Sequence, residues 1–245
     1  MLNAILLSLL AGLATGVGGL IVVSMKKVSK RALGFGLGLS SGIMIIIGIH
    51  DLFGKSIELG DYNLAVASFI AGALFILAID ALVPHEFFFT EGGVKGEKFC
   101  LMKVGIITAF GITIHNIPEG MIVGAGYAAM PAFGIALTIA IALHNIPEGI
   151  AVSVPLRACG WNRRKVLSVS FLSGLAEPLG AVAAVAFLSF IPGILPVLLG
   201  FAGGVMTYLT MDELIPAAHK YGSPHSIGAG LMAGLILAML IGQMV

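Results

Sequence analysis

Charged side chains are scarce in this chain. It has 13 basic and 12 acidic residues among 245, or 10%, whereas a soluble domain carries about 25%. Hydrophobic residues make up 58% and the mean hydropathy is +1.08, so the composition excludes an ordinary soluble enzyme and a disordered chain. The formal net charge is only +1, without a large basic cluster, which argues against nucleic acid as a partner. We therefore expect a protein that folds in a lipid bilayer.

Cysteine is nearly absent. The two cysteines, Cys100 and Cys159, form no pair with metal-ligand spacing and make a poor disulfide framework. A thiolate metal site and a small disulfide-stapled fold are both disfavoured.

Polar segments long enough for a soluble domain are also missing. A transmembrane helix needs about 20 mostly apolar residues, and the chain contains eight such runs with short loops between them. We predict an all-α polytopic membrane protein forming a single transmembrane domain over residues 1–245. Its predicted spans cover residues 2–24, 32–53, 63–84, 101–126, 132–156, 166–190, 195–216 and 226–244.

The basic residues predict how these spans are oriented. Lys and Arg are retained on the cytoplasmic side of membrane proteins, and only Lys55 lies opposite the others. An even number of spans then puts both termini outside the cytoplasm, in a multi-pass protein of the cell membrane (the inner membrane if bacterial). The remaining basic residues lie in or beside the loops after spans 1, 3, 5 and 7: Lys26, Lys27, Lys30, Arg31, Lys95, Lys98, Lys103, Arg157, Arg163, Arg164, Lys165 and Lys220.

Two six-residue words are identical. His-Asn-Ile-Pro-Glu-Gly occupies residues 115–120 in span 4 and residues 144–149 in span 5. Because a short turn joins these spans, the helices run antiparallel and bring both words to a similar depth in the membrane. A weaker match links span 2 to span 7 at an offset of 162 residues, through Gly42-Ile43-Met44 and Gly204-Val205-Met206. Since these spans run in opposite directions, the match predicts inverted-topology repeats, a transporter design.

Carboxylates in the middle of the bilayer must be paired, bind an ion or line water, because an isolated charge there costs at least about 2.5 kcal/mol. Residues four apart share a helix face, so each word forms a two-ligand pincer. Nearby side chains add oxygen and amide groups. The predicted metal ligands are His115, Asn116, Glu119, His144, Asn145, Glu148 and Glu177.

Mixed imidazole and carboxylate ligands favour borderline divalent metals such as zinc, iron, cobalt, manganese and cadmium over calcium or magnesium. Seven side chains exceed the needs of one tetrahedral zinc, so a two-ion centre bridged by Glu119 and Glu148 is plausible. The alternative for any single residue is a helix-to-helix hydrogen bond.

Further polar residues lie near the ends of the spans. His50 and Asp51 end span 2 outside, as a possible entrance, and Asp212 and Glu213 end span 7 inside, as a possible exit. Solvation by water at the interface explains these pairs equally well. Whether His85, His219 and His225 bind metal is left open, and for such residues near loops a solvated role is favoured.

Together these motifs resemble the ZIP (Zrt-, Irt-like protein) family of divalent metal transporters, in particular its bacterial broad-specificity branch. The resemblance covers the whole chain and includes Glu-Pro at residues 177–178 and Asp-Glu-Leu-Ile-Pro at residues 212–216. It implies a 3+2+3 helix arrangement, inward metal transport and an elevator-like motion of spans 1, 4, 5 and 6. Many members carry a long His-rich loop after span 3, whereas this chain has only His85 there.

The resemblance also implies roles for individual residues. His115, Glu119, His144 and Glu148 correspond to the principal transport site. A second site comprises Asn116, Asn145 and Glu177, with Glu119 and Glu148 as bridges. Asp51 corresponds to the entrance, and Asp212 and Glu213 correspond to the exit.

The leading hypothesis is therefore uptake of divalent transition metal ions by alternating access, with two bound ions as substrate and no catalytic cofactor. The alternatives are an intramembrane binuclear metallohydrolase, which lacks the His-Glu-x-x-His word of zinc proteases, and a pore. A homodimer is possible, but no sequence feature requires it. The preferred metal and any coupling to protons are not determined by the sequence.

Overall fold

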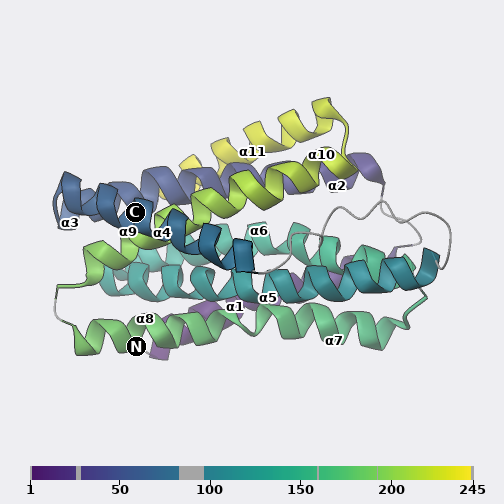
Figure 1. Cartoon of the computed structure of the whole chain (residues 1–245), viewed down its shortest axis with the longest axis horizontal. Helices are drawn as coiled ribbons and strands as arrows, with labels where there is room; N and C mark the ends of the chain where they lie inside the picture. The colour runs from purple at the N-terminus through teal and green to yellow at the C-terminus, as the bar shows by residue number, and fades with distance from the viewer. Residues whose placement is uncertain (1, 26–28, 83–96, 159, 192, 244–245) are drawn as a thin grey trace.

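The computed structural model describes residues 2–25, 29–82, 97–158, 160–191 and 193–243, without the side chains of residue 30 and of residues 79–82, 97–108 and 220–221. All regular structure in these ranges is helical. Among the described residues, six helices are long and apolar enough to cross a membrane. Both ends of the chain lie at the same end of the bundle (Figure 1), as an even number of crossings requires.

Each predicted span coincides with a helix or a run of helices. In chain order these are α1 (Leu2–Ser24), α2 (Lys30–Ile45), η1 (Ile46–Phe53), α3 (Gly54–Leu59), α4 (Tyr62–Leu82), α5 (Glu97–Ala129), α6 (Pro131–Ala158), α7 (Arg163–Gly174), α8 (Glu177–Phe190), α9 (Leu195–Leu209), η3 (Thr210–Leu214), α10 (Ile215–Tyr221) and α11 (Pro224–Gly242). The all-α, polytopic fold class is confirmed.

Three spans differ in detail from the prediction. Span 2 continues without a break to Leu59, and span 7 continues to Tyr221, each through a π-helical segment, η1 or η3. Span 6 is two helices rather than one. Leu175 and Ala176 form a turn between α7 and α8, and Pro178 occupies the first turn of α8, where its missing N–H costs nothing.

The helices form two groups. α1, α5, α6, α7 and α8 pack against one another, and we call them the site bundle because they carry all seven predicted ligands. α2, η1, α3, α4, α9, η3, α10 and α11 form the second group, the frame bundle. The two bundles meet mainly where α2 and α11 contact α6 and where α9 contacts α5.

Within the site bundle, two helix pairs pack in the same way. α5 meets α8 at Gly120, where an added Cβ would lie 1.7 Å from the carbonyl oxygen of Glu177. α6 meets α1 at Gly149, where an added Cβ would lie 1.8 Å from the carbonyl oxygen of Thr15. Only glycine permits such backbone approaches. The two glycines are equivalent positions of the duplicated word, and the two carbonyls are 162 residues apart.

The frame bundle repeats the same offset. An added Cβ on Gly204 of α9 would lie 1.9 Å from the carbonyl oxygen of Phe69, and one on Gly42 of α2 would lie 2.3 Å from that of Leu231. Gly42 and Gly204 are 162 positions apart, and so are Phe69 and Leu231. α1 and the run of α7 and α8 point in opposite directions in Figure 1. The two sets of three spans are therefore inverted repeats, and α5 and α6 lie between them.

Several residues named in the sequence analysis fall outside the described residues. These are Lys26, Lys27 and Lys95, together with His85 and Cys159.

Candidate metal centre

The duplicated words face each other across the contact between α5 and α6. Their histidines, asparagines and glutamates are at most 3% exposed, and Glu177 at the start of α8 is fully buried. Pro118 and Pro147 lie inside α5 and α6, and both helices continue through them. The structure thus brings both words and the third carboxylate into the interior of one bundle.

Four side chains form a compact quartet. His115, Glu119, His144 and Glu148 each offer one ligand atom, and these four atoms lie within 4.8 Å of one another. The two histidine rings are 6.1 Å apart between centroids.

The histidine-to-carboxylate separations in the quartet are close to those of a tetrahedral zinc site. His115 Nε2 lies 3.3 Å from Glu119 Oε1 and 3.5 Å from Glu148 Oε1. His144 Nε2 lies 2.7 Å from Glu119 Oε1 and 3.4 Å from Glu148 Oε1. Zinc bonds of about 2.0–2.2 Å in a tetrahedron separate neighbouring ligand atoms by about 3.3–3.6 Å. Three of the four distances fit this range, and the fourth needs a shift of less than about 1 Å.

The other carboxylate oxygens of the quartet are buried without a partner. Neither Glu119 Oε2 nor Glu148 Oε2 has a hydrogen-bond partner among the described residues. An unpaired buried carboxylate oxygen is costly, so these two atoms are positioned to accept an ion or a proton. Each glutamate could hold one ion through Oε1 and another through Oε2.

Asn116, Asn145 and Glu177 form a second group beside the quartet. Asn145 Nδ2 donates to Glu177 Oε1 and to the carbonyl oxygen of Ala11, and Asn116 Nδ2 donates to the carbonyl oxygen of Ser173. These bonds fix both amides with their oxygens free. Among the described residues, the Oδ1 atoms of both asparagines and Glu177 Oε2 have no hydrogen-bond partner. This group offers oxygen ligands alone.

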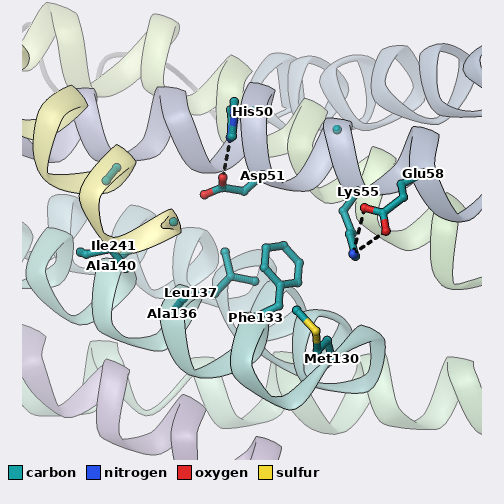
Figure 2. Close-up of a pocket in the computed structure, with 13 residues that line it drawn as sticks. His50, Asp51, Lys55, Glu58, Met130, Phe133, Ala136, Leu137, Ala140 and Ile241 are labelled. Carbon is teal, nitrogen blue, oxygen red and sulfur yellow. Dashed lines mark hydrogen bonds and ion pairs between the residues drawn. The ribbon is translucent and has the colours of Figure 1, made fainter. Parts of the chain in front are cut away.

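At one end of the bundle, His50 and Asp51 line a pocket of about 310 Å³ between the two bundles (Figure 2). His50 Nδ1 lies 2.8 Å from Asp51 Oδ1, and the His50 side chain is 75% exposed, whereas that of Asp51 is 15% exposed. Lys55 and Glu58 line the same pocket and form an ion pair. The opposite wall comes from α6 and is apolar.

At the other end, Asp212 and Glu213 lie in η3. Asp212 is exposed, but Glu213 reaches the quartet: its Oε2 lies 4.0 Å from His115 Nδ1. The structure therefore joins Glu213 to the centre and leaves the other three end residues, His50, Asp51 and Asp212, apart from it. His219 and His225 are exposed and join neither group.

Thr15 was not among the predicted site residues. It is fully buried in α1, and its Oγ1 has no hydrogen-bond partner among the described residues. A repeat in the sequence relates Thr15 to Glu177. Gly-Leu-Ala occurs at residues 12–14 and again at residues 174–176, at the offset of 162, followed by Thr15 in one copy and Glu177 in the other.

Comparison with known proteins gives a consistent result. The family described as "ZIP Zinc transporter" matches residues 91–245. A protein named "Zinc transporter ZupT" from Oceanobacillus iheyensis is 42% identical over 256 residues, which cover 97% of this chain and 96% of that protein. Proteins of the same name from Akkermansia muciniphila (42% identity, 96% and 95% coverage) and Lysinibacillus sphaericus (43% identity, 94% and 92% coverage) are similarly close. On this fold, this centre and these relatives, the chain belongs to the ZIP zinc transporter family.

Proposed function

We propose that this protein takes up divalent transition metal ions into the cytoplasm, with zinc as the leading substrate and iron, cobalt, manganese or cadmium as further candidates. The observation that carries the proposal is the buried quartet of His115, Glu119, His144 and Glu148, whose separations suit a tetrahedral ion. In the dry interior of a membrane protein, an ion leaves its hydration shell only if ligands of this kind replace the lost water.

We propose two ions in the loaded centre. The quartet holds the first, and the second is held by the Asn116, Asn145 and Glu177 group with Glu119 and Glu148 as bridges. The free oxygens of that group support this assignment. So does the charge balance, because three carboxylates carry −3 and two divalent ions carry +4.

Transport by alternating access follows from the inverted repeats. Asp51 and Glu213 are 162 residues apart, and His115 and His144 are equivalent positions of the duplicated word. In this conformation Glu213 lies 4.0 Å from His115. The symmetry-related conformation would bring Asp51 close to His144. The outer pocket already reaches Ala140, about 6 Å along the helix from His144.

In this scheme Asp51 and His50 receive the ion outside, and Glu213 and Asp212 release it inside. The site bundle moves relative to the frame bundle to exchange the two contacts. We propose that residues 1–245 form one transporter domain in the cell membrane with both termini outside the cytoplasm. The basic residues at the end of α6 and the start of α7 support this orientation. The lipid bilayer surrounds it, and a homodimer is compatible with the scheme.

A binuclear centre can also activate water for hydrolysis. The similar proteins are named transporters, so we propose no enzymatic activity.

Uptake into proteoliposomes tests the proposal. Purified protein should speed the entry of Zn²⁺ into vesicles that contain a zinc-sensitive dye, and the initial rate should saturate with zinc, as expected of a carrier rather than a pore. The double variant Glu119→Ala, Glu148→Ala should reduce entry to that of empty vesicles. Asp61→Asn, which changes an exposed carboxylate that caps the start of α4, is the matched control. Entry no faster than in empty vesicles would refute the proposed function.

A further inference from the structure

Thr15 and Glu177 occupy corresponding places in the two repeats. Asn145 donates to the carbonyl oxygen of Ala11, four residues before Thr15, and Asn116 donates to that of Ser173, four residues before Glu177. The donors are equivalent asparagines of the duplicated word, and the acceptors are 162 residues apart. The surroundings of the two side chains therefore match, although only one of them is a carboxylate.

The hydroxyl of Thr15 lacks the bond that such groups normally make. Hydroxyls in helices commonly donate to the carbonyl four residues back. In Thr15 that carbonyl belongs to Ala11, and Asn145 already donates to it. Seven other described hydroxyls make this backbone bond: those of Ser41, Ser68, Thr113, Thr138, Ser189, Thr207 and Thr210.

Thr15 Oγ1 lies beside the crossing of α1 and α7, where Gly12 and Gly174 touch. It would be 3.2 Å from a Cβ on Gly174, and Glu177 Oε1 would be 3.3 Å from a Cβ on Gly12. The two oxygens therefore flank the same backbone contact. Thr15 Oγ1 is one of several buried oxygens there without a hydrogen-bond partner in the described part of the chain, with those of Asn116, Asn145 and Glu177.

We propose that Thr15 is a further ligand of the second ion: its hydroxyl oxygen completes the oxygen-only group of Asn116, Asn145 and Glu177. This inference rests on the two-ion centre proposed above. A neutral oxygen at this position adds coordination without adding charge. An all-oxygen group suits hard cations such as Mn²⁺, whereas the quartet with its imidazoles suits Zn²⁺. Thr15 thus favours the occupation of the second site by the harder ions.

Manganese binding to the zinc-loaded protein tests this role. The purified full chain, carrying one equivalent of Zn²⁺, is titrated with MnCl₂, and free Mn²⁺ is followed by its electron paramagnetic resonance signal. The wild type should bind one equivalent of Mn²⁺. Thr15→Val should weaken this binding by about tenfold, the low end of the loss found when a group supporting a metal site is removed. Thr15→Ser should stay within about twofold of the wild type.

Two controls separate a ligand role from a packing role. Thr138→Val removes a buried hydroxyl that donates to the carbonyl oxygen of Gly134, and it should leave Mn²⁺ binding unchanged. Binding of the first Zn²⁺ equivalent should be the same in all variants and reports that each is folded. If Thr15→Val does not fold, Thr15→Ala also removes the hydroxyl, with a smaller side chain.

The outcomes are distinct. Wild-type Mn²⁺ affinity in Thr15→Val, or equal losses in Thr15→Val and Thr138→Val, would overturn the role of Thr15. A wild type that binds Zn²⁺ but no Mn²⁺ would overturn the second site, and Thr15 with it. A wild type that binds no Zn²⁺ would overturn the proposed function itself.

Discussion

The closest helix contact at the centre predicts a large effect from the smallest substitution. In Gly120→Ala, the new Cβ would lie 1.7 Å from the carbonyl oxygen of Glu177, and real Cβ atoms essentially never approach closer than 3.0 Å. The difference of about 1.3 Å must come from separating α5 and α8 at this point. Overpacking of this kind costs about 1–3 kcal/mol of unfolding free energy.

The same displacement acts on the metal centre. Glu119 precedes Gly120 on α5, and Glu177 lies at the contact on α8, so a shift of about 1.3 Å separates two carboxylates proposed to share an ion. Metal-ligand distances tolerate only about 0.2 Å. We expect the affinity for the second ion to fall by at least tenfold, about 1.4 kcal/mol.

The assay pairs thermal unfolding with metal titration. Gly111→Ala lies on the same helix, with nothing within 4 Å of the new Cβ, so it should keep wild-type metal affinity. It should also gain about 0.5–1 kcal/mol from alanine's better helix propensity. If Gly120→Ala bound metal as the wild type does, the geometry argued for this contact would be wrong.

Three further predictions follow from the centre. Glu119→Gln should lower zinc affinity by at least about 100-fold, or about 2.7 kcal/mol, because an amide replaces a charged ligand of both proposed sites. Asp61→Asn should leave the affinity unchanged, and equal calorimetric titrations of the two variants would contradict this. Acidification should weaken zinc binding, because imidazole and carboxylate must lose protons to bind metal, and unchanged affinity between neutral and mildly acidic buffer would count against histidine ligands. The symmetry-related conformation would bring residue 51 close to residue 144. In a variant without native cysteines, the double substitution Asp51→Cys, His144→Cys should therefore form a disulfide in membranes under oxidising conditions. No disulfide at any metal concentration would argue against this conformation.

The spans and the duplicated words could be predicted from the sequence for clear physical reasons. Apolar runs of bilayer length specify membrane helices independently of their neighbours. A carboxylate within such a run is too costly without a partner, so its presence identifies the interior of the bundle. This is why Glu119, Glu148 and Glu177 were all predicted to lie buried, and all three do.

The remaining features depend on contacts that no local pattern encodes. The π-helical segments η1 and η3 arise within runs that are apolar and helical by composition. Thr15 lies in an apolar helix where a hydroxyl normally bonds its own backbone, so nothing local distinguishes it. Its environment becomes visible only when the offset of 162 residues is extended to α1.

The end residues differ between the two repeats, and this difference distinguishes the two faces of the protein. The two halves of the quartet come from identical six-residue segments, so the quartet presents the same ligands toward both faces of the membrane. The quartet alone therefore does not distinguish the two faces. The residues near the ends of the spans do distinguish them. η1 carries His50 and Asp51, with Lys55 one turn further on, whereas η3 carries Asp212 and Glu213. The Lys55 charge is paired with Glu58, so the η1 end keeps one carboxylate, Asp51, beside the His50 imidazole. Two adjacent carboxylates attract a divalent ion more strongly than this arrangement does. In the proposed scheme, the η3 end therefore competes better with the quartet for the ion than the η1 end does.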